Sequence, residues 1–137
     1  MAREVVEAYR AAPPPGVEIR FVGPAEPLPA SFDPKLLPRA LRNLVENAVR
    51  ASGGGGEVEV RLAGGGGQAR LTVADRGPGV PPAQLERIFE PYFSLHAGGT
   101  GLGLPIARRI AEEHGGTLVA HNRASGGLEA VITIPLA

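Results

Sequence analysis

The order in which two periodicities follow each other along the 137 residues constrains the fold more than any other feature. Five short runs alternate apolar and polar residues as strands do: 17–22, 57–62, 69–74, 117–122 and 128–135. Helical spacing instead governs residues 34–52 and 104–114, and a glycine- and proline-rich segment, 76–100, precedes the second of these helices. This order predicts an α/β fold of two layers, a mixed sheet with its helices packed on one face.

The first long helix places three polar residues on one stripe. Either Ser31 or Asp33 can cap its start. Its apolar positions follow helical spacing: Leu37, Leu41, Leu44, Val45 and Ala48. Asn43, Asn47 and Arg50 then share a neighbouring stripe at positions i, i+4 and i+7.

Charge and composition exclude several classes of function. The 14 basic and 14 acidic residues balance, so the chain lacks the field that holds a nucleic-acid backbone or an anionic membrane. The absence of cysteine excludes disulfides, thiolate metal sites and thiol nucleophiles. No run approaches the roughly 18 apolar residues of a membrane span. We therefore expect a cytoplasmic domain with no nucleic-acid partner and no direct membrane contact. Any anionic ligand must be bound by a few residues at a local site.

Two asparagines one helical turn apart form the first candidate site. Amide oxygens are suitable ligands for Mg²⁺, which takes the rest of its coordination shell from water and phosphates. Asn43 and Asn47 could therefore hold this metal. The alternative is that both are solvated helix positions, and their spacing alone leaves the two interpretations open.

An acidic residue at the end of a strand begins the second candidate site, DRGPG at residues 75–79. An ionised aspartate only accepts hydrogen bonds, so Asp75 can take one from an adenine amino group. Gly77 and Gly79 would let the backbone approach the base closely. A tight turn without a ligand is the alternative.

Two further motifs lie within or at the end of the long glycine- and proline-rich segment. The apolar residues of IFEPYF, residues 88–93, predict either a docking lid or a satellite hydrophobic cluster. The sequence GGTGLGL, residues 98–104, leads into a helix, where backbone N–H groups and the helix dipole favour a phosphate. This loop matches neither the dinucleotide-binding nor the P-loop pattern.

In this order and spacing, the four motifs resemble the N, first glycine, F and second glycine boxes of the histidine-kinase-type ATP-binding domain, in the superfamily shared with gyrases and mismatch-repair ATPases. The resemblance covers residues 17–136. It implies a Bergerat-type two-layer α/β sandwich that binds ATP and Mg²⁺ beneath a mobile lid. The nucleotide-binding residues that it implies are Asn43, Asn47, Arg50, Asp75, Gly77, Gly79, Phe89, Phe93, Thr100, Gly101, Leu102, Gly103, Leu104 and Thr133.

The resemblance also implies a role for each group of residues. Asn47 is the principal Mg²⁺ ligand, Asn43 assists it, and Arg50 approaches a phosphate. Asp75 binds the adenine amino group, between the glycines of its own box. The glycines of the second glycine box border the phosphates, and Thr133 on the last strand joins the polar contacts around adenine.

The same resemblance distinguishes a kinase from a hydrolase. Hydrolases of the superfamily place a water-activating glutamate one turn before the metal-binding asparagine, and here that position is Asn43. Because an amide oxygen is a poor base, the site favours positioning ATP for another nucleophile. Glu46 is rotated by roughly 100° from Asn47 around the helix, so we interpret it as a structural or interface residue.

The expected nucleophile is a histidine on a separate dimerisation domain. In the family this histidine precedes an acidic residue, whereas His96, His114 and His121 do not. We therefore interpret residues 1–12 as a remnant of the helix that leaves the dimerisation domain, and residues 13–137 as the ATP-binding catalytic domain. Alone, it should be a monomer that binds ATP without autophosphorylation. Its expected partners are the dimerisation domain and, through a parent protein that is either membrane-anchored or soluble, a response regulator.

Two positions depart from the family pattern. The lid is most similar to the nitrogen-regulation class, where Ser-Thr-Lys follows the F box, but residues 94–96 here are Ser-Leu-His. Ala51 stands where many members carry an aromatic residue, so aliphatic neighbours must pack the adenine. Two alternatives stay open: an anti-sigma-factor-like serine kinase, and a degenerate domain that binds nucleotide only to govern the docking of a partner.

Overall fold

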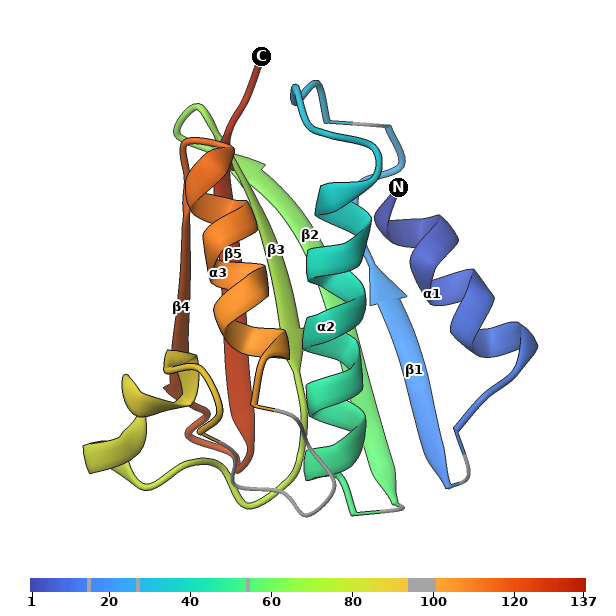
Figure 1. The fold of residues 1–137 in the computed structure, drawn as a ribbon. Helices are drawn as coiled ribbons and strands as arrows, with labels where there is room; N and C mark the ends of the chain where they lie inside the picture. The colour runs from blue at the N-terminus through green and yellow to red at the C-terminus, as the bar shows by residue number, and fades with distance from the viewer. Residues whose placement is uncertain (15, 27, 54, 94–100) are drawn as a thin grey trace.

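A five-stranded mixed sheet forms one layer of the protein in this computed structural model (Figure 1). The structure describes residues 1–14, 16–26, 28–53, 55–93 and 101–137. Across the sheet the strand order is β1-β2-β3-β5-β4, with β1 parallel to β2 and every other pair antiparallel. The strands are β1 (Val17–Val22), β2 (Gly56–Gly65), β3 (Gln68–Ala74), β4 (Thr117–Asn122) and β5 (Leu128–Pro135).

The first hairpin turns more tightly than the sequence predicted. The strand runs predicted at 57–62 and 69–74 leave residues 63–68 between them, but Gly64 and Gly65 pair with Ala69 and Gln68 in the ladder between β2 and β3. The turn is therefore only Gly66 and Gly67, whose φ angles are 61° and 75°. Two successive positive φ angles suit a two-residue hairpin turn, and glycine adopts them without strain.

Two helices cover one face of the sheet, as predicted, and a third lies beside them (Figure 1). They are α2 (Leu36–Ala51), α3 (Gly103–Glu113) and α1 (Ala2–Ala11). The predicted apolar stripe of α2 is confirmed, because each of its members is buried: Leu37, Leu41, Leu44, Val45 and Ala48. Each fully buried leucine or valine contributes about 1.5–3 kcal/mol of hydrophobic stabilisation. The two-layer α/β sandwich is thus confirmed.

The start of α2 and the end of α3 are joined by capping contacts. Asp33, not Ser31, caps α2: its Oδ1 accepts the backbone N–H groups of Lys35 at 2.8 Å and Leu36 at 3.0 Å. These two hydrogen bonds lower the pKa of the Asp33 carboxyl. His114, at the end of α3, accepts the backbone N–H of Asp33 through Nε2 at 2.9 Å. The two helices therefore share one anchored end, away from the candidate site.

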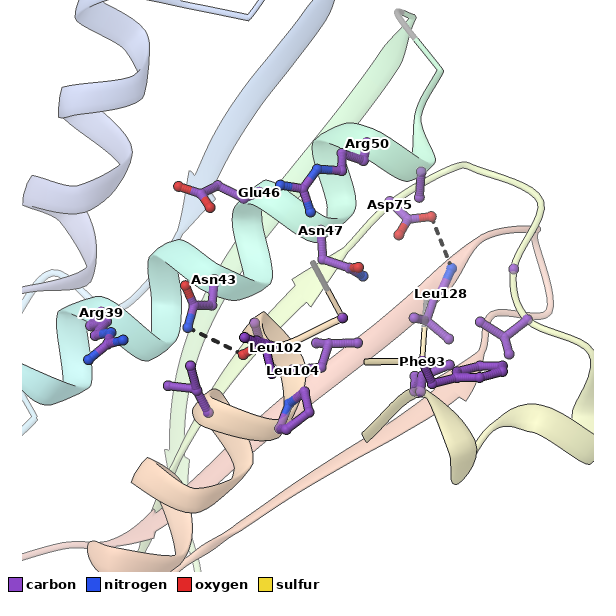
Figure 2. Close-up of a pocket in the computed structure, with 18 residues that line it drawn as sticks. Arg39, Asn43, Glu46, Asn47, Arg50, Asp75, Phe93, Leu102, Leu104 and Leu128 are labelled. Carbon is purple, nitrogen blue, oxygen red and sulfur yellow. Dashed lines mark hydrogen bonds between the residues drawn. The ribbon is translucent and has the colours of Figure 1, made fainter. Parts of the chain in front are cut away.

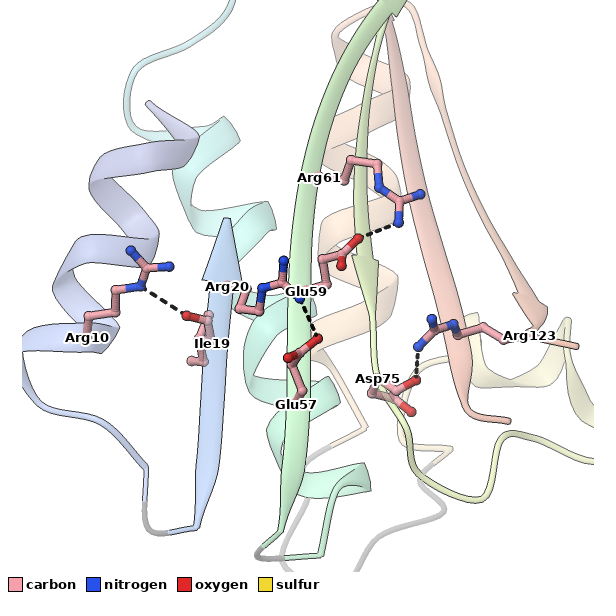
Figure 3. A network of polar contacts seen from close by, with 8 residues as sticks. All are labelled: Arg10, Ile19, Arg20, Glu57, Glu59, Arg61, Asp75 and Arg123. Carbon is pink, nitrogen blue, oxygen red and sulfur yellow. Dashed lines mark hydrogen bonds and ion pairs between the residues drawn. The ribbon is translucent and has the colours of Figure 1, made fainter. Parts of the chain in front are cut away.

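Helix α1 packs against β1 and α2, with Val5 and Val6 in the hydrophobic core. Arg10 of α1 donates from Nε to the carbonyl oxygen of Ile19 in β1 at 3.0 Å (Figure 3). The origin of this helix in a dimerisation domain stays a prediction. Within the described ranges, no helix is long and apolar enough to cross a membrane.

The segment that follows β3 contains two 3-10 helices, η1 (Pro82–Gln84) and η2 (Arg87–Phe89). Ile88 and Phe89 of η2 are buried and hold this segment on the core. The guanidinium of Arg108 in α3 lies 4.6 Å from the centre of the Phe89 ring. Residues 94–100 of the predicted mobile lid lie outside the described residues.

Candidate nucleotide-binding site

A cavity of about 370 Å³ opens between α2, the start of α3, the end of β3 and the start of β5 (Figure 2). Most of the residues that the sequence predicted for the site line it, although they come from four separate stretches of the chain. They are Asn43, Asn47, Arg50, Asp75, Gly79, Phe93, Gly101, Leu102, Gly103 and Leu104. The fold thus brings the four motifs to one place.

The polar stripe of α2 forms one wall of this cavity. Asn43 donates from Nδ2 to the carbonyl oxygen of Gly103 at 3.2 Å, which joins α2 to the first residue of α3. Asn47 is half-buried and has no hydrogen-bond partner among the described residues. Its amide, like the Oδ1 of Asn43, is free to contact a ligand. Both asparagines therefore line the cavity, and their role as metal ligands stays a prediction.

Asp75 is the buried carboxylate of the site, with 2% of its surface exposed. Its Oδ1 accepts the backbone N–H of Gly77 at 2.9 Å and that of Leu128 at 3.1 Å. Within the described ranges, Oδ2 has no partner. Asp75 lines the cavity, so Oδ2 can accept a hydrogen bond from a ligand donor there.

The glycines after Asp75 are required by close contacts. A Cβ at Gly77 would overlap the carbonyl oxygen of Ala51 at the end of α2. A Cβ at Gly79, where φ is 74°, would lie 2.6 Å from Oδ1 of Asn122. Gly79 lines the cavity, whereas Gly77 shapes it from behind by letting the loop pass close to α2.

Two residues at the end of β4 hold this loop from the other side, and the sequence analysis did not find them. Asn122 accepts the backbone N–H of Val80 through Oδ1 at 2.8 Å and donates from Nδ2 to the carbonyl oxygen of Val80 at 2.7 Å. Arg123 donates to the carbonyl oxygen of Asp75 at 2.8 Å (Figure 3). Their signal in the sequence is weak, since polar residues are common in turns.

The second glycine box contacts the F box where Gly101 lies against Tyr92. Gly101 has a φ of 73°, and a Cβ there would lie 2.6 Å from Cα of Tyr92. The backbone N–H of Tyr92, itself at a φ of 67°, donates to the carbonyl oxygen of Gly101 at 2.9 Å. This contact joins Tyr92 to Gly101 beside the cavity, which Phe93 and Gly101 line. The predicted site residue Thr100 lies outside the described residues.

The two aromatic residues of the F box have different surroundings. Phe93 lines the cavity, and the guanidinium of Arg87 lies 4.6 Å from the centre of its ring. Phe89 is buried beneath Arg108 and does not line the cavity. Phe89 therefore anchors the segment, whereas Phe93 can contact a ligand.

Comparison with known proteins identifies the family. Residues 32–137 match the family model described as histidine kinase-, DNA gyrase B-, and HSP90-like ATPase. The chain belongs to this ATPase family. The sensor histidine kinase ZraS of Escherichia coli O157:H7 is 35% identical over 120 residues, which cover 88% of this chain and 26% of ZraS.

Solved structures place the chain among the catalytic domains of histidine kinases. The nucleotide-free catalytic domain of ThkA has 33% identity and a TM-score of 0.83, over 98% of this chain and 91% of that chain. Full-length ShkA in complex with AMPPNP has 33% identity and a TM-score of 0.84, over 99% of this chain and 29% of that chain. ThkA in complex with the response regulator TrrA has 31% identity, with a TM-score of 0.79, over 98% of this chain and 39% of that chain. The chain therefore corresponds to one domain of these longer kinases, and its assignment to the nitrogen-regulation class stays a prediction.

One residue that the sequence analysis placed in the site of this histidine kinase domain lies elsewhere. Thr133 pairs with Arg70 and Thr117 across the sheet, near the end opposite Asp75. It alternates with Ile132 and Ile134, which are buried beneath the helices, so its side chain is on the other face of the sheet. The family resemblance had implied a contact of Thr133 with adenine, but the residue of β5 that lines the cavity is Leu128, at the other end of the strand.

Several aliphatic residues complete the cavity of the kinase domain. Where many family members carry an aromatic residue, Ala51 lines it together with neighbours whose side chains are apolar: Val80, Ile88, Leu104, Ile106 and Leu128. The aliphatic surroundings expected from Ala51 are therefore present. Arg39 and Glu46 of α2 also line the cavity, and the sequence analysis had assigned neither of them to it.

Proposed function

We propose that this chain binds Mg²⁺ and ATP in the cavity and transfers the γ-phosphoryl group to a histidine on a separate dimerisation domain. The observation that carries the proposal is the buried carboxylate of Asp75, whose Oδ2 has no partner among the described residues and which lies beside the aliphatic residues of the cavity. An adenine amino group supplies the missing donor, and its flat ring suits the apolar walls. AMPPNP in the ShkA structure supports a nucleotide in this fold.

The donor set around the phosphate end of the cavity suits Mg²⁺. The described residues contain no cluster of three or more His, Cys, Asp or Glu side chains that could enclose a metal. Mg²⁺ does not need such a cluster, because it retains waters and shares its shell with phosphates. Asn47 and Asn43 would hold the ion by their amide oxygens, and the ion would supply charge neutralisation at the phosphates.

Backbone and side-chain donors then surround the phosphates. Gly101 and Gly103 line the cavity at the start of α3, where the first N–H groups of the helix are directed outward. Arg50 lines the opposite wall from α2. Together they would hold the triphosphate in a fixed orientation, which is the main contribution that a protein makes to phosphoryl transfer.

The residues of α2 favour a kinase over a hydrolase. Asn43 occupies the position of the water-activating glutamate, and its Nδ2 is already bonded to Gly103. Glu46 lies at the edge of the cavity, where its Oε1 is 3.5 Å from the hydroxyl of Tyr9 in α1 (Figure 2). That contact supports a structural or interface role for Glu46. Without a base beside the metal ligands, ATP would await an external nucleophile.

The partners of the whole kinase follow from this function. The acceptor histidine would belong to the dimerisation domain, and the phosphoryl group would pass to a response regulator, as the complex of ThkA with TrrA suggests. The domain would then act in the cytoplasm, where ATP is available.

A phosphoryl-transfer assay tests the proposal. The protein is incubated with ATP labelled at the γ-phosphate, alone and with the histidine-bearing dimerisation domain of its parent kinase. We expect label on the dimerisation domain only, dependence on Mg²⁺, and a rate about 100-fold lower for Asn47→Ala. Release of free phosphate at a comparable rate without the dimerisation domain would instead indicate a hydrolase and contradict the proposal.

A further inference from the structure

Arg39 is a second cation at the cavity, beyond the stripe that the family motif covers. It lies on α2 one turn before Asn43 and two turns before Asn47, and it lines the cavity (Figure 2). Within the described part of the chain, its guanidinium makes no ion pair or hydrogen bond. A free cation facing a pocket is available to an anionic ligand.

The positions along α2 fix which part of a nucleotide Arg39 would meet. The base pocket is at the C-terminal end of the helix, where Gly77 passes the carbonyl group of Ala51 and leads to Asp75. Asn47 and Asn43 follow in the direction of the N-terminus of α2, and Arg39 is last in this order (Figure 2). The backbone of Arg39 lies about 12 Å along the helix axis from that of Asn47. Its long side chain can bring the guanidinium closer to the metal site.

The charges at the cavity point to the same role. A triphosphate keeps excess negative charge after binding one Mg²⁺, so further cations stabilise it. Arg50 lies on the base side of the asparagines and Arg39 on the far side. The two arginines thus bracket the metal ligands. A triphosphate joined through its ribose to a base near Asp75 would bring its last phosphate nearest to Arg39.

We propose that Arg39 contacts the γ-phosphate of ATP and gives the site its preference for ATP over ADP. This assignment rests on the proposed nucleotide function. The contact would hold the terminal phosphoryl group at the open end of the cavity, where an incoming acceptor must reach it. Arg50, by its position, would bind the phosphates that ATP and ADP have in common.

The chain offers a matched control for Arg39. Arg42 is three residues further along α2, is also exposed, and does not line the cavity. It lies instead beside Tyr9 and Phe32, in the groove between α1 and the start of α2. Arg42→Gln removes the same charge from the same helix and leaves the net charge equal to that of Arg39→Gln.

Calorimetric titration with ATP and with ADP, each with Mg²⁺, tests the assignment on the unchanged domain and the two variants. We expect Arg39→Gln to weaken ATP binding by about tenfold, as loss of one charged hydrogen bond does, with ADP binding within about twofold. Arg42→Gln should leave both affinities within about twofold, as expected for a residue outside the cavity. Arg39→Lys should restore part of the ATP affinity, because it keeps the charge and loses the planar guanidinium.

The possible failures are distinct. An ATP affinity that Arg39→Gln leaves unchanged, or equal losses for ATP and ADP, would overturn the Arg39 assignment and leave the proposed function intact. The same selective loss in Arg42→Gln would reduce the effect to general electrostatics and also overturn it. No binding of either nucleotide by the unchanged protein would overturn the proposed function, and the role of Arg39 with it.

Discussion

At the scale of single residues, the site depends on where side chains are absent as much as on where they are present. Asp75 has its Oδ1 occupied by two backbone N–H groups, and these bonds fix the direction of Oδ2. One of them comes from Gly77, which can donate only because its lack of a Cβ allows the loop to approach Ala51. The acidic residue and the glycine therefore act together.

Gly77→Ala should disturb both stability and binding. The new Cβ would overlap the carbonyl oxygen of Ala51, so the loop must move, at a cost of about 1–3 kcal/mol in the free energy of unfolding. Urea unfolding measures this cost. Gly55→Ala is the control, because no atom lies within 4 Å of a Cβ at that position. Equal stabilities of the two variants would contradict the proposed close contact.

At the scale of elements, the end of β4 supports the loop that leaves β3. Asn122 makes two hydrogen bonds to Val80, and Arg123 makes one to the carbonyl oxygen of Asp75. β4 and β3 are not neighbours, since β5 lies between them in the sheet. The side chains of Asn122 and Arg123 therefore reach past the start of β5 and hold the loop that follows β3 in place.

Asn122→Ala should loosen this loop with little effect on the rest of the fold. Both hydrogen bonds to Val80 are lost at an exposed position, so we expect a cost of about 1 kcal/mol. Amide hydrogen exchange should accelerate at Val80 while the amides of Val58 and Val60, in β2, keep their protection. Unchanged exchange at Val80 would show that the loop does not depend on Asn122.

At the scale of the whole molecule, periodicity was enough to predict the architecture, because burial of one face of each element leaves a strong pattern. The core stripe of α2 and the bounds of β4 and β5 follow the sequence prediction. The order of the motifs, through the family resemblance, was also enough to predict that Asn43 and Asp75 lie at one site, and both line the cavity. Thr133 was assigned to the site from the family resemblance, whereas strand pairing places it at the end of β5 away from the cavity.

The remaining features depend on contacts between distant segments. The hydrogen bond between Val80 and Asn122 joins residues 42 positions apart, so no local sequence pattern predicts it. Arg39 resembles any exposed arginine of a helix until the structure places it at the cavity. Hydrogen bonds and charges of this kind are set by the assembled fold, whereas apolar periodicity is set by each element alone.

The most direct test of the central claim is the affinity for ATP with Mg²⁺, measured by calorimetry on the unchanged protein and on Asp75→Asn. The substitution preserves the shape of the side chain, but the amide replaces an acceptor oxygen or presents a donor to the adenine amino group. We predict clear binding by the unchanged protein and a loss of tenfold or more, roughly that of a charged hydrogen bond, in the variant. No binding by the unchanged protein at millimolar ATP, or equal affinities of the two proteins, would contradict the account.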